Sequence, residues 1–385
     1  MATRPSLTPV FSDEEYSTRL ERLREAMAAR GIESLICTAP ESLFYLSGFD
    51  ANTAWSDQAL VVNASGTPQL LIRDIDEPII DGQVVGTEVL TYNFGTVEPV
   101  DVIARMVTGP TVALEYRGSG ASLSYVDRIT ERIGGGRRLP DGSDLVSELR
   151  IRKSPAELQI VREAGRIADE ALDEAIPLLR PGISELQFAG VIEYALRRRN
   201  SEYPGMPTWM ASGPKSSCSH ASPSARIIQA GEPLKCSFAA VRHRYHVTTY
   251  QSFFLGDPPS QYTDIFGQCQ ESLEAVISTI DVGVSFREAS LAGNRVLERY
   301  GLADRNMGRW GYGVGIAYPP TWLEPMNIMI ESDGVFDIGM VFCMHVSMAL
   351  PELGFGFTVG ADYLVDERGP SRVNRRAPEI IRIDA

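Results

Sequence analysis

Cysteine and histidine are scarce in this chain of 385 residues, which has five cysteines, four histidines and no Cys-x-x-Cys spacing. An odd number of widely spaced cysteines argues against a disulfide framework or a zinc ribbon and favours reduced thiols. The chain also has no apolar run near the roughly 20 residues of a membrane span, and its first residues lack the apolar core of a secretory signal. We therefore expect a cytoplasmic protein with no membrane partner.

Net positive charge is also missing, since the formal charge is −14. Nucleic-acid binders and proteins that bind acidic membranes need a basic face to neutralise phosphates, so we expect neither partner. Hydrophobic residues make up 44% of the chain and charged residues 22%, which is typical of a globular protein. Small molecules are the expected partners, and the length suits about two domains.

The first part of the sequence alternates between helical and strand patterns. A helical pattern starts at Asp13, buried strands are predicted at 34–38 and 111–117, and two apolar runs flank a turn at 65–68. This alternation predicts a small α/β domain over residues 1–150.

A helix start signal marks the expected domain boundary. Ser154, Pro155 and Glu157 form a capping box with proline at the first helical position, so a long helix should open a second domain over residues 151–385. The alternative is a helix that starts inside one continuous domain.

The second domain contains a weak internal repeat. Residues 180–199 and 281–301 each have a glycine, a β-branched residue and a serine before an amphipathic helix, with Gly182 and Gly283 in matching places. Glycine-punctuated strands follow each helix. The repeat predicts two related halves about a pseudo-twofold axis, with a site between their sheets.

Two of the histidines lie in the stretch "KCSFAAVRHRYHVTTYQSFF". His243 and His246 are three residues apart, so in a strand they point to opposite faces and one metal does not easily take both. We expect "VRHR" to be a hairpin tip that pairs Ser237 with Thr248. Both histidines are then peripheral, although His246 remains within possible reach of the cleft.

Several motifs in order resemble one known family. They are "RxxKSPAE", "PGISE", "GEPLKCSF", "WGYGVG" and "FDIGMVFCMH", which together are similar to the creatinase/methionine-aminopeptidase (pita-bread, M24-type) superfamily. The stretches "RHRYH", "FLGDPP" and "YPPTWLE" resemble its metal-free branch, which contains creatinase and ectoine hydrolase. The resemblance implies an α/β (α+β) fold, with a small N-terminal α/β domain and a C-terminal pita-bread domain of duplicated halves.

The resemblance also identifies the positions of metal ligands in the peptidase members. Ser237 and Thr248 stand where those members have two aspartates, Tyr312 replaces a histidine, and His345 and Gly360 replace two glutamates. Hydroxyls, one imidazole and a glycine supply no anionic oxygen at neutral pH, so we expect no metal and no cofactor.

Catalysis is assigned to side chains alone. His220 aligns with the acid/base histidine of creatinase, and an imidazole of pKa near 6.5 can accept and return a proton at neutral pH. His345 and Tyr312 complete the predicted catalytic set, although His220 could be an ordinary loop histidine and His345 a satisfied core residue. We expect Cys236 and Cys343 to point away from the cleft. The predicted substrate-binding residues are Ser237, Thr248, Asp362, Tyr318, Trp55 and Asp57.

The functional hypothesis is a metal-independent hydrolase that cleaves a C–N bond in a small nitrogen-rich metabolite, such as an ectoine-like cyclic amidine or a creatine-like amidino compound. By the same resemblance we expect a homodimer in which the loop 48–58, with Trp55 and Asp57, lies near the partner's site. The alternatives are a metal-free lyase acting on a small charged metabolite and a non-catalytic small-molecule binding protein.

Overall fold

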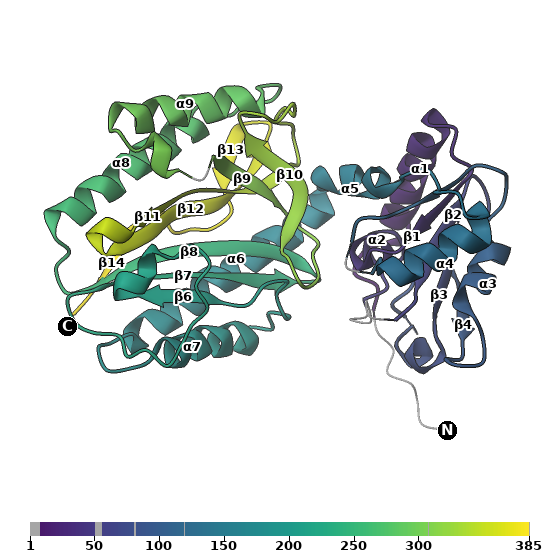
Figure 1. Ribbon diagram of the computed structural model, residues 1–385, viewed down its shortest axis with the longest axis horizontal. Coiled ribbons are helices and arrows are strands. Elements are labelled where there is room, and N and C mark those ends of the chain that lie inside the picture. The colour runs from purple at the N-terminus through teal and green to yellow at the C-terminus, as the bar shows by residue number, and fades with distance from the viewer. Residues whose placement is uncertain (1–7, 51–55, 81, 119, 307, 385) are drawn as a thin grey trace. The chain divides into compact units, whose positions relative to one another are not determined.

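The computed structural model describes residues 8–50, 56–80, 82–118, 120–306 and 308–384 (Figure 1). The chain forms two compact units, Met1–Arg150 and Ile151–Ala385. Within the described residues, no helix is both long enough and apolar enough to cross a membrane.

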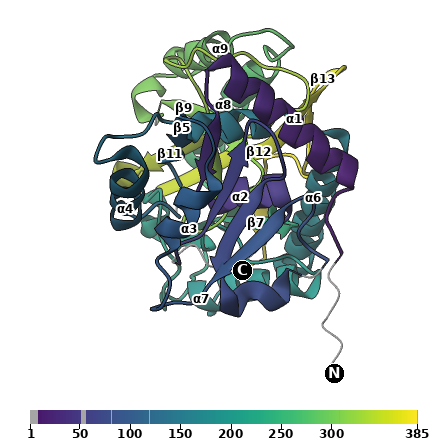
Figure 2. The ribbon, with the colours of Figure 1, turned by 90° about the vertical axis from the view of Figure 1, so that its right-hand side faces the viewer.

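The first unit is a five-stranded mixed sheet with helices around it (Figure 2). The strand order is β4-β3-β2-β1-β5, with β1 antiparallel to β2 and parallel to β5. Side chains of α3 and α4 pack on one face of the sheet and form its main apolar cluster. The elements are α1 (Asp13–Ala29), β1 (Ser34–Cys37), α2 (Pro40–Ser47), β2 (Ala59–Asn63), β3 (Gln69–Arg73), β4 (Glu88–Tyr92), α3 (Pro99–Met106), β5 (Val112–Leu114), α4 (Leu123–Gly134) and α5 (Ser143–Ile151).

The second unit has two sheets, each covered by a pair of helices (Figure 1). Helices α6 and α7 pack on the sheet β14-β8-β7-β6, and α8 and α9 pack on the sheet β10-β9-β11-β12-β13. The elements are α6 (Pro155–Ala175), α7 (Glu185–Arg198), β6 (Trp209–Ser212), β7 (Pro233–Arg242), β8 (Tyr245–Leu255), α8 (Ser260–Ile277), α9 (Phe286–Arg299), β9 (Arg309–Val314), β10 (Leu323–Met329), β11 (Val341–Leu350), β12 (Phe355–Asp366), β13 (Gly369–Arg372) and β14 (Ile380–Ile383).

The internal repeat has a structural counterpart in the two halves of this unit. The N–H of Gly182 donates to Ile228 O at 2.9 Å, and the N–H of Gly283 donates to Phe336 O at 2.8 Å. Both glycines have positive φ, +93° and +84°, which disfavours any other residue at these turns. The serine two residues later caps α7 in one half and α9 in the other. The predicted duplicated architecture is confirmed.

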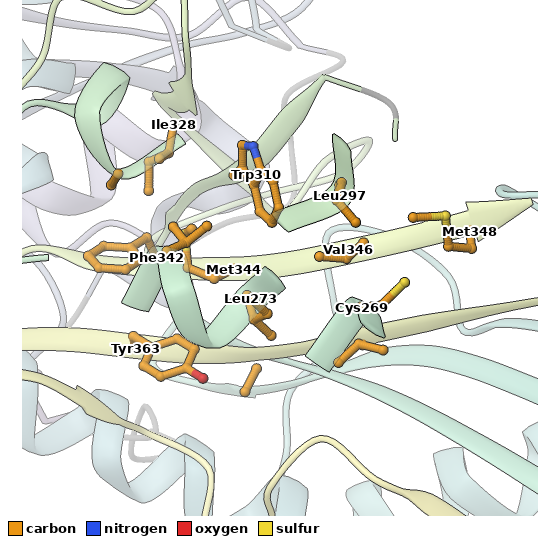
Figure 3. Close-up of a cluster of buried hydrophobic side chains, with 14 of the residues drawn as sticks. Cys269, Leu273, Leu297, Trp310, Ile328, Phe342, Met344, Val346, Met348 and Tyr363 are labelled. Atoms are coloured by element: carbon orange, nitrogen blue, oxygen red, sulfur yellow. The ribbon is translucent and has the colours of Figure 1, made fainter. Parts of the chain in front are cut away.

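Trp310 anchors the core of the second half. Figure 3 shows its ring against Leu297 of α9 and above Met344 and Val346 of β11. A Cβ at Gly293 would lie 2.4 Å from this ring, so the small residue lets α9 approach the sheet closely. This packing fixes strands β9 and β11, which carry site residues on their other face.

The turn between β7 and β8 is centred one residue later than predicted, which moves each cross-strand partner by two residues. His243 and Arg244 have φ of +46° and +65°, and Arg242 pairs with Tyr245 across this two-residue turn. The carboxylate of Glu202 accepts hydrogen bonds from the backbone N–H groups of His243 (2.8 Å) and Arg244 (2.9 Å), which stabilises the unusual conformation.

The register that follows from this turn corrects a prediction. Ser237 pairs with Tyr250, and Thr248 pairs with Ala239. The expected pairing of Ser237 with Thr248 is wrong, and it had hidden Tyr250 as the residue opposite Ser237.

His246 is fully buried and structurally satisfied. Its Nε2 accepts from the Gly205 N–H at 2.8 Å, and its Nδ1 lies 2.9 Å from Arg244 O, to which it donates in the corresponding tautomer. It does not line the pocket described below. This histidine therefore holds the 205 loop against β8.

Protonation of His246 should destabilise the protein in mild acid. Burial lowers its pKa to about 3, against about 6.5 in an unfolded chain, so its stabilising contribution is complete above about pH 6.5 and is lost as pH falls toward 3. Within that window the free energy of unfolding should fall by about 1.4 kcal/mol per pH unit from this group. Urea unfolding across this range should show a shallower pH dependence for His246→Gln than for the wild type. Equal slopes would rule out this role.

Candidate functional site

A cavity of about 330 Å³ opens between the two sheets of the second unit. It receives residues from both halves, as expected for a site between duplicated units. Of the described residues that line it, none is acidic, two are histidines and one is an arginine. They are Met206, Trp209, Ser219, His220, Ser237, Tyr250, Arg309, Tyr312, Trp322, Leu323, His345, Ser347 and Thr358.

The structure brings four of the predicted site residues to this cavity. His220 comes from the loop after β6, Ser237 from β7, Tyr312 from β9 and His345 from β11. Strands β9 and β11 are neighbours in one sheet, and β6 and β7 are neighbours in the other. Each sheet therefore contributes site residues from adjacent strands.

The other predicted residues lie elsewhere. Thr248 and Asp362 are fully buried and do not line the cavity, and buried Tyr318 packs against the guanidinium of Arg244 instead. Asp57 belongs to the first unit, where it forms an ion pair with Arg128. Trp55 lies outside the described residues.

A pair of tyrosines forms one side of the cavity. The hydroxyls of Tyr250 and Tyr312 hydrogen-bond to each other, and Trp322 Nε1 donates to Tyr312 Oη at 3.1 Å. The ring of His345 lies 5.3 Å from the Tyr250 ring and 5.7 Å from the Tyr312 ring, measured between centroids. Two hydroxyls and an imidazole are therefore held together by packing and hydrogen bonds.

Cys343 lies directly behind this pair, which corrects its predicted orientation. It is two residues from His345, so both side chains leave the same face of β11. It pairs in register with Tyr312 and Asp362, and its thiol hydrogen-bonds with side chains around it, including Tyr250. Cys236, in contrast, faces the apolar core as predicted, and burial raises its pKa to about 12.

Asp362 is committed to internal partners. Both oxygens of its carboxylate accept from Thr248, one from the backbone N–H at 2.6 Å and one from the hydroxyl. Burial raises its pKa to about 7, although these hydrogen bonds and that with Cys343 oppose the shift. A carboxylate in this position supports the cavity from below and does not reach a ligand.

Both histidines of the cavity are neutral at pH 7. Burial, the charge of Arg309 and the repulsion that a protonated His220 would exert lower the pKa of His345 to about 4, and its buried Nδ1 has no hydrogen-bond partner among the described residues. Partial burial and the charges of Lys235 and Arg309 lower the pKa of His220 below 6.5. The His220 ring lies 4.2 Å from that of Trp209 in an edge-on contact. Each imidazole can thus accept a proton or a hydrogen bond.

The donor atoms here do not fit a pair of divalent cations. Of the five positions that match metal ligands in the peptidase members, only His345 offers a strong donor, since the hydroxyls of Thr248 and Tyr312 are already engaged. A Cβ at Gly360 would lie 2.6 Å from His345 Cβ, so a larger residue does not fit without displacement. Over the described part of the chain, no group of three or more histidine, cysteine, aspartate or glutamate residues could hold a metal ion.

The sequence interpretation missed several cavity residues. Tyr250 was missed because of the register error. The guanidinium of Arg309 lies 4.8 Å from the Tyr312 ring centroid, although strand alternation would place these two residues on opposite faces; a β-bulge in β9 between Arg309 and Gly311 breaks that alternation. Lys235, which shares a face of β7 with the lining residue Ser237 but does not line the cavity itself, was detectable as a lysine within a largely apolar strand.

The sequence of this chain is similar to those of known proteins. The sequence model described as Metallopeptidase family M24 matches residues 159–367, and the Creatinase/Prolidase N-terminal domain matches residues 19–152. The chain is 26% identical to an uncharacterized hydrolase/peptidase of Sinorhizobium fredii, over 96% of this chain and 98% of that one.

Two further similarities are to proteins whose names state an activity. The chain is 24% identical to the ectoine hydrolase of Halomonas elongata, over 93% of this chain and 95% of that one. The crystal structure of dipeptidase PepE from Mycobacterium ulcerans superposes with a TM-score of 0.85 at 22% identity, covering 97% of this chain and 100% of the other. The latter likeness defines the fold.

Proposed function

Since the chain belongs to metallopeptidase family M24 and is thereby placed among its hydrolases, we propose that it is a metal-independent member that cleaves a C–N bond in a small nitrogen-rich metabolite. The observation that carries this proposal is the loss of every carboxylate from the five matched ligand positions, together with two imidazoles and a tyrosine pair around one cavity. Such groups can move protons and stabilise an oxyanion, but they hold divalent cations poorly.

The cavity supports a small substrate. Its volume of about 330 Å³ is at the lower end of ligand pockets, and Trp209, Trp322 and the two tyrosines give it flat aromatic walls. The similarity to an ectoine hydrolase favours a compact heterocycle or amidino compound over a peptide. Ectoine-like cyclic amidines and creatine-like compounds are the substrate classes that we propose.

His220 is the proposed general base and acid. Neutral His220 takes a proton from a water molecule as the water oxygen forms a bond to the sp² carbon of the substrate. The C–N bond then breaks, and the same imidazole returns the proton to the leaving nitrogen. The water thus adds its oxygen and one proton to the former sp² carbon and its other proton to the leaving nitrogen, whether the two ends separate or remain in one ring-opened product.

The tyrosine pair is the proposed oxyanion site. Two hydroxyls carry two protons, and only one is needed for the bond between Tyr250 and Tyr312. The other can be donated to the oxygen that the water brings to the reacting carbon, as negative charge develops on it in the tetrahedral intermediate. Trp322 holds Tyr312 in place, and Ser237 and His345 supply further hydrogen-bonding groups for orienting the substrate.

The oligomeric state is a separate proposal. We propose a homodimer, as the family resemblance implies; of the loop 48–58 that was expected near the partner's site, residues 51–55 lie outside the described residues. Sedimentation equilibrium should give twice the chain mass, and a monomer that still turns over substrate would contradict it.

Product analysis in heavy-oxygen water tests the proposed reaction. The protein is incubated with ectoine, hydroxyectoine, creatine and related cyclic amidines, and the products are read by mass spectrometry. We expect one heavy oxygen atom in one product. A product without the label would indicate a lyase, and binding of a compound without any product would indicate a binding protein.

A further inference from the structure

Lys235 of β7 is a buried lysine without a counterion in its hydrogen-bonding range. The residue is only 7% exposed, and its Nζ has no hydrogen-bond partner among the described residues. It leaves the same face of β7 as Ser237, two residues further along, and Ser237 lines the cavity. Together with partial burial, its charge lowers the pKa of His220, which lines the cavity, whereas Lys235 itself lies behind the lining residues.

Two other buried cations, Lys153 and Arg244, have partners among the described residues, in contrast to Lys235. Lys153 is equally buried and forms an ion pair with Glu324. The guanidinium of Arg244 donates to the carbonyl oxygens of Tyr203 and Ala317. An unpaired buried ammonium costs free energy, so its presence beside a pocket points to a ligand that completes the pair.

The surroundings of the cavity are short of negative charge. Arg309 places a cation in its wall, and the buried Nδ1 of His345 has no hydrogen-bond partner among the described residues. None of the described lining residues is acidic, although the chain as a whole carries −14. A cationic ligand would find no counterion among the described lining residues, whereas an anion would find Arg309 in the lining and Lys235 next to Ser237 on the same face of β7.

We propose that Lys235 is the anion-binding residue of this cavity and that the substrate carries a carboxylate, which the Lys235 ammonium neutralises on binding. This inference rests on the cavity being the substrate site of the proposed function. A single buried ammonium with one nearby guanidinium matches a monoanion, while a phosphate dianion requires more donors. Arg309 strengthens the field from the opposite sheet. The proposal excludes guanidinium or amidinium compounds that lack an acid group.

Benzoate and benzamide are a matched pair of probes, because they share shape and differ only in the charge of one group. Calorimetry should show that wild-type protein prefers benzoate. In Lys235→Met the benzoate affinity should fall by about 30-fold or more, since the partner of a buried charge is lost, while benzamide affinity should change little. Equal affinity of the wild type for both probes, no binding of benzoate, or an unchanged preference in the variant would overturn the proposal.

Stability separates a ligand-binding lysine from a structural one. Lys235→Met removes an unpaired charge and should keep or raise Tm, whereas the control Lys153→Met leaves Glu324 buried without its cation and should lower Tm. A large loss of Tm in Lys235→Met would indicate a structural role and contradict the proposal.

Proton uptake provides a second readout. Burial lowers the pKa of Lys235 to about 8, and a bound carboxylate should raise it, so benzoate binding at about pH 9 should take up protons in the wild type. The same measurement on Lys235→Met separates proton uptake by Lys235 from proton uptake by Cys218 or His220, because only the uptake by Lys235 is lost in the variant. These binding measurements need no turnover. Carboxylate preference without hydrolysis would refute only the proposed function, and hydrolysis without that preference would refute only the role of Lys235.

Discussion

Replacing His220 by alanine should lower kcat for C–N cleavage by about 10²–10⁴-fold, which is the usual contribution of a positioned general acid/base. The side chain is exposed at the cavity wall, so the variant should fold normally. Steady-state kinetics on the substrate found by product analysis measures the effect. KM should change less than kcat, because the imidazole acts on the reacting atoms.

A histidine outside the cavity provides the control. His243→Asn retains a residue that tolerates the positive φ of this turn and should leave kcat near the wild-type value. The pH profile adds a test of mechanism. The pKa of His220 lies below 6.5, so the wild-type rate should be maintained at neutral pH and fall in acid as the base becomes protonated. An unchanged rate in His220→Ala would refute the role of this residue.

Replacing Tyr312 by phenylalanine should have the second largest effect, a fall in kcat of about 10²–10³-fold, as for loss of one oxyanion donor. The variant removes one hydroxyl of the pair with Tyr250 and the acceptor of Trp322, while the ring can keep its contact with His345. Kinetics and Tm should be measured together, since a catalytic loss at unchanged Tm separates chemistry from packing.

Tyr262→Phe is the matched control for this variant. Tyr262 is a fully buried tyrosine of α8 in the apolar cluster of the second half, away from the cavity lining. Its kcat should equal that of the wild type. If Tyr312→Phe were as active as this control, the tyrosine pair would have no catalytic role.

The parts of the fold that were predictable depend on local sequence. The capping box at Ser154 and the paired glycine turns at Gly182 and Gly283 are decided within a few residues, and the structure contains each of them. The duplicated halves followed from these local signals together with the resemblance. His220, Ser237, Tyr312 and His345 were placed in one cavity by the same route.

The parts that were missed depend on contacts between distant residues. The hairpin register turns on positive φ at His243 and Arg244, which is uncommon for such residues and is supported by Glu202, 41 positions before His243. The shift of two residues kept Ser237 and Thr248 on the inward face but exchanged their partners. It therefore concealed Tyr250, the residue that completes the tyrosine pair.

The remaining differences between the predicted and the observed site depend on how deeply a side chain is buried. Thr248 and Asp362 share the inward face with cavity residues, but they bond to each other below the tyrosines. The sequence pattern predicts the face of a strand from which a side chain projects, but not how deeply that side chain is buried. In the same way, the lack of a partner for Lys235 is visible only when the surrounding chain is folded around it.

Turnover by protein stripped of metal tests the central claim most directly. The protein is treated with a chelator, its metal content is checked by elemental analysis, and hydrolysis is measured before and after addition of Mn²⁺ or Zn²⁺. We predict full activity at far less than stoichiometric metal and no stimulation by either ion, because imidazole and hydroxyl groups carry out the reaction. Activity that disappears with the metal and returns with Mn²⁺ or Zn²⁺ would contradict the account.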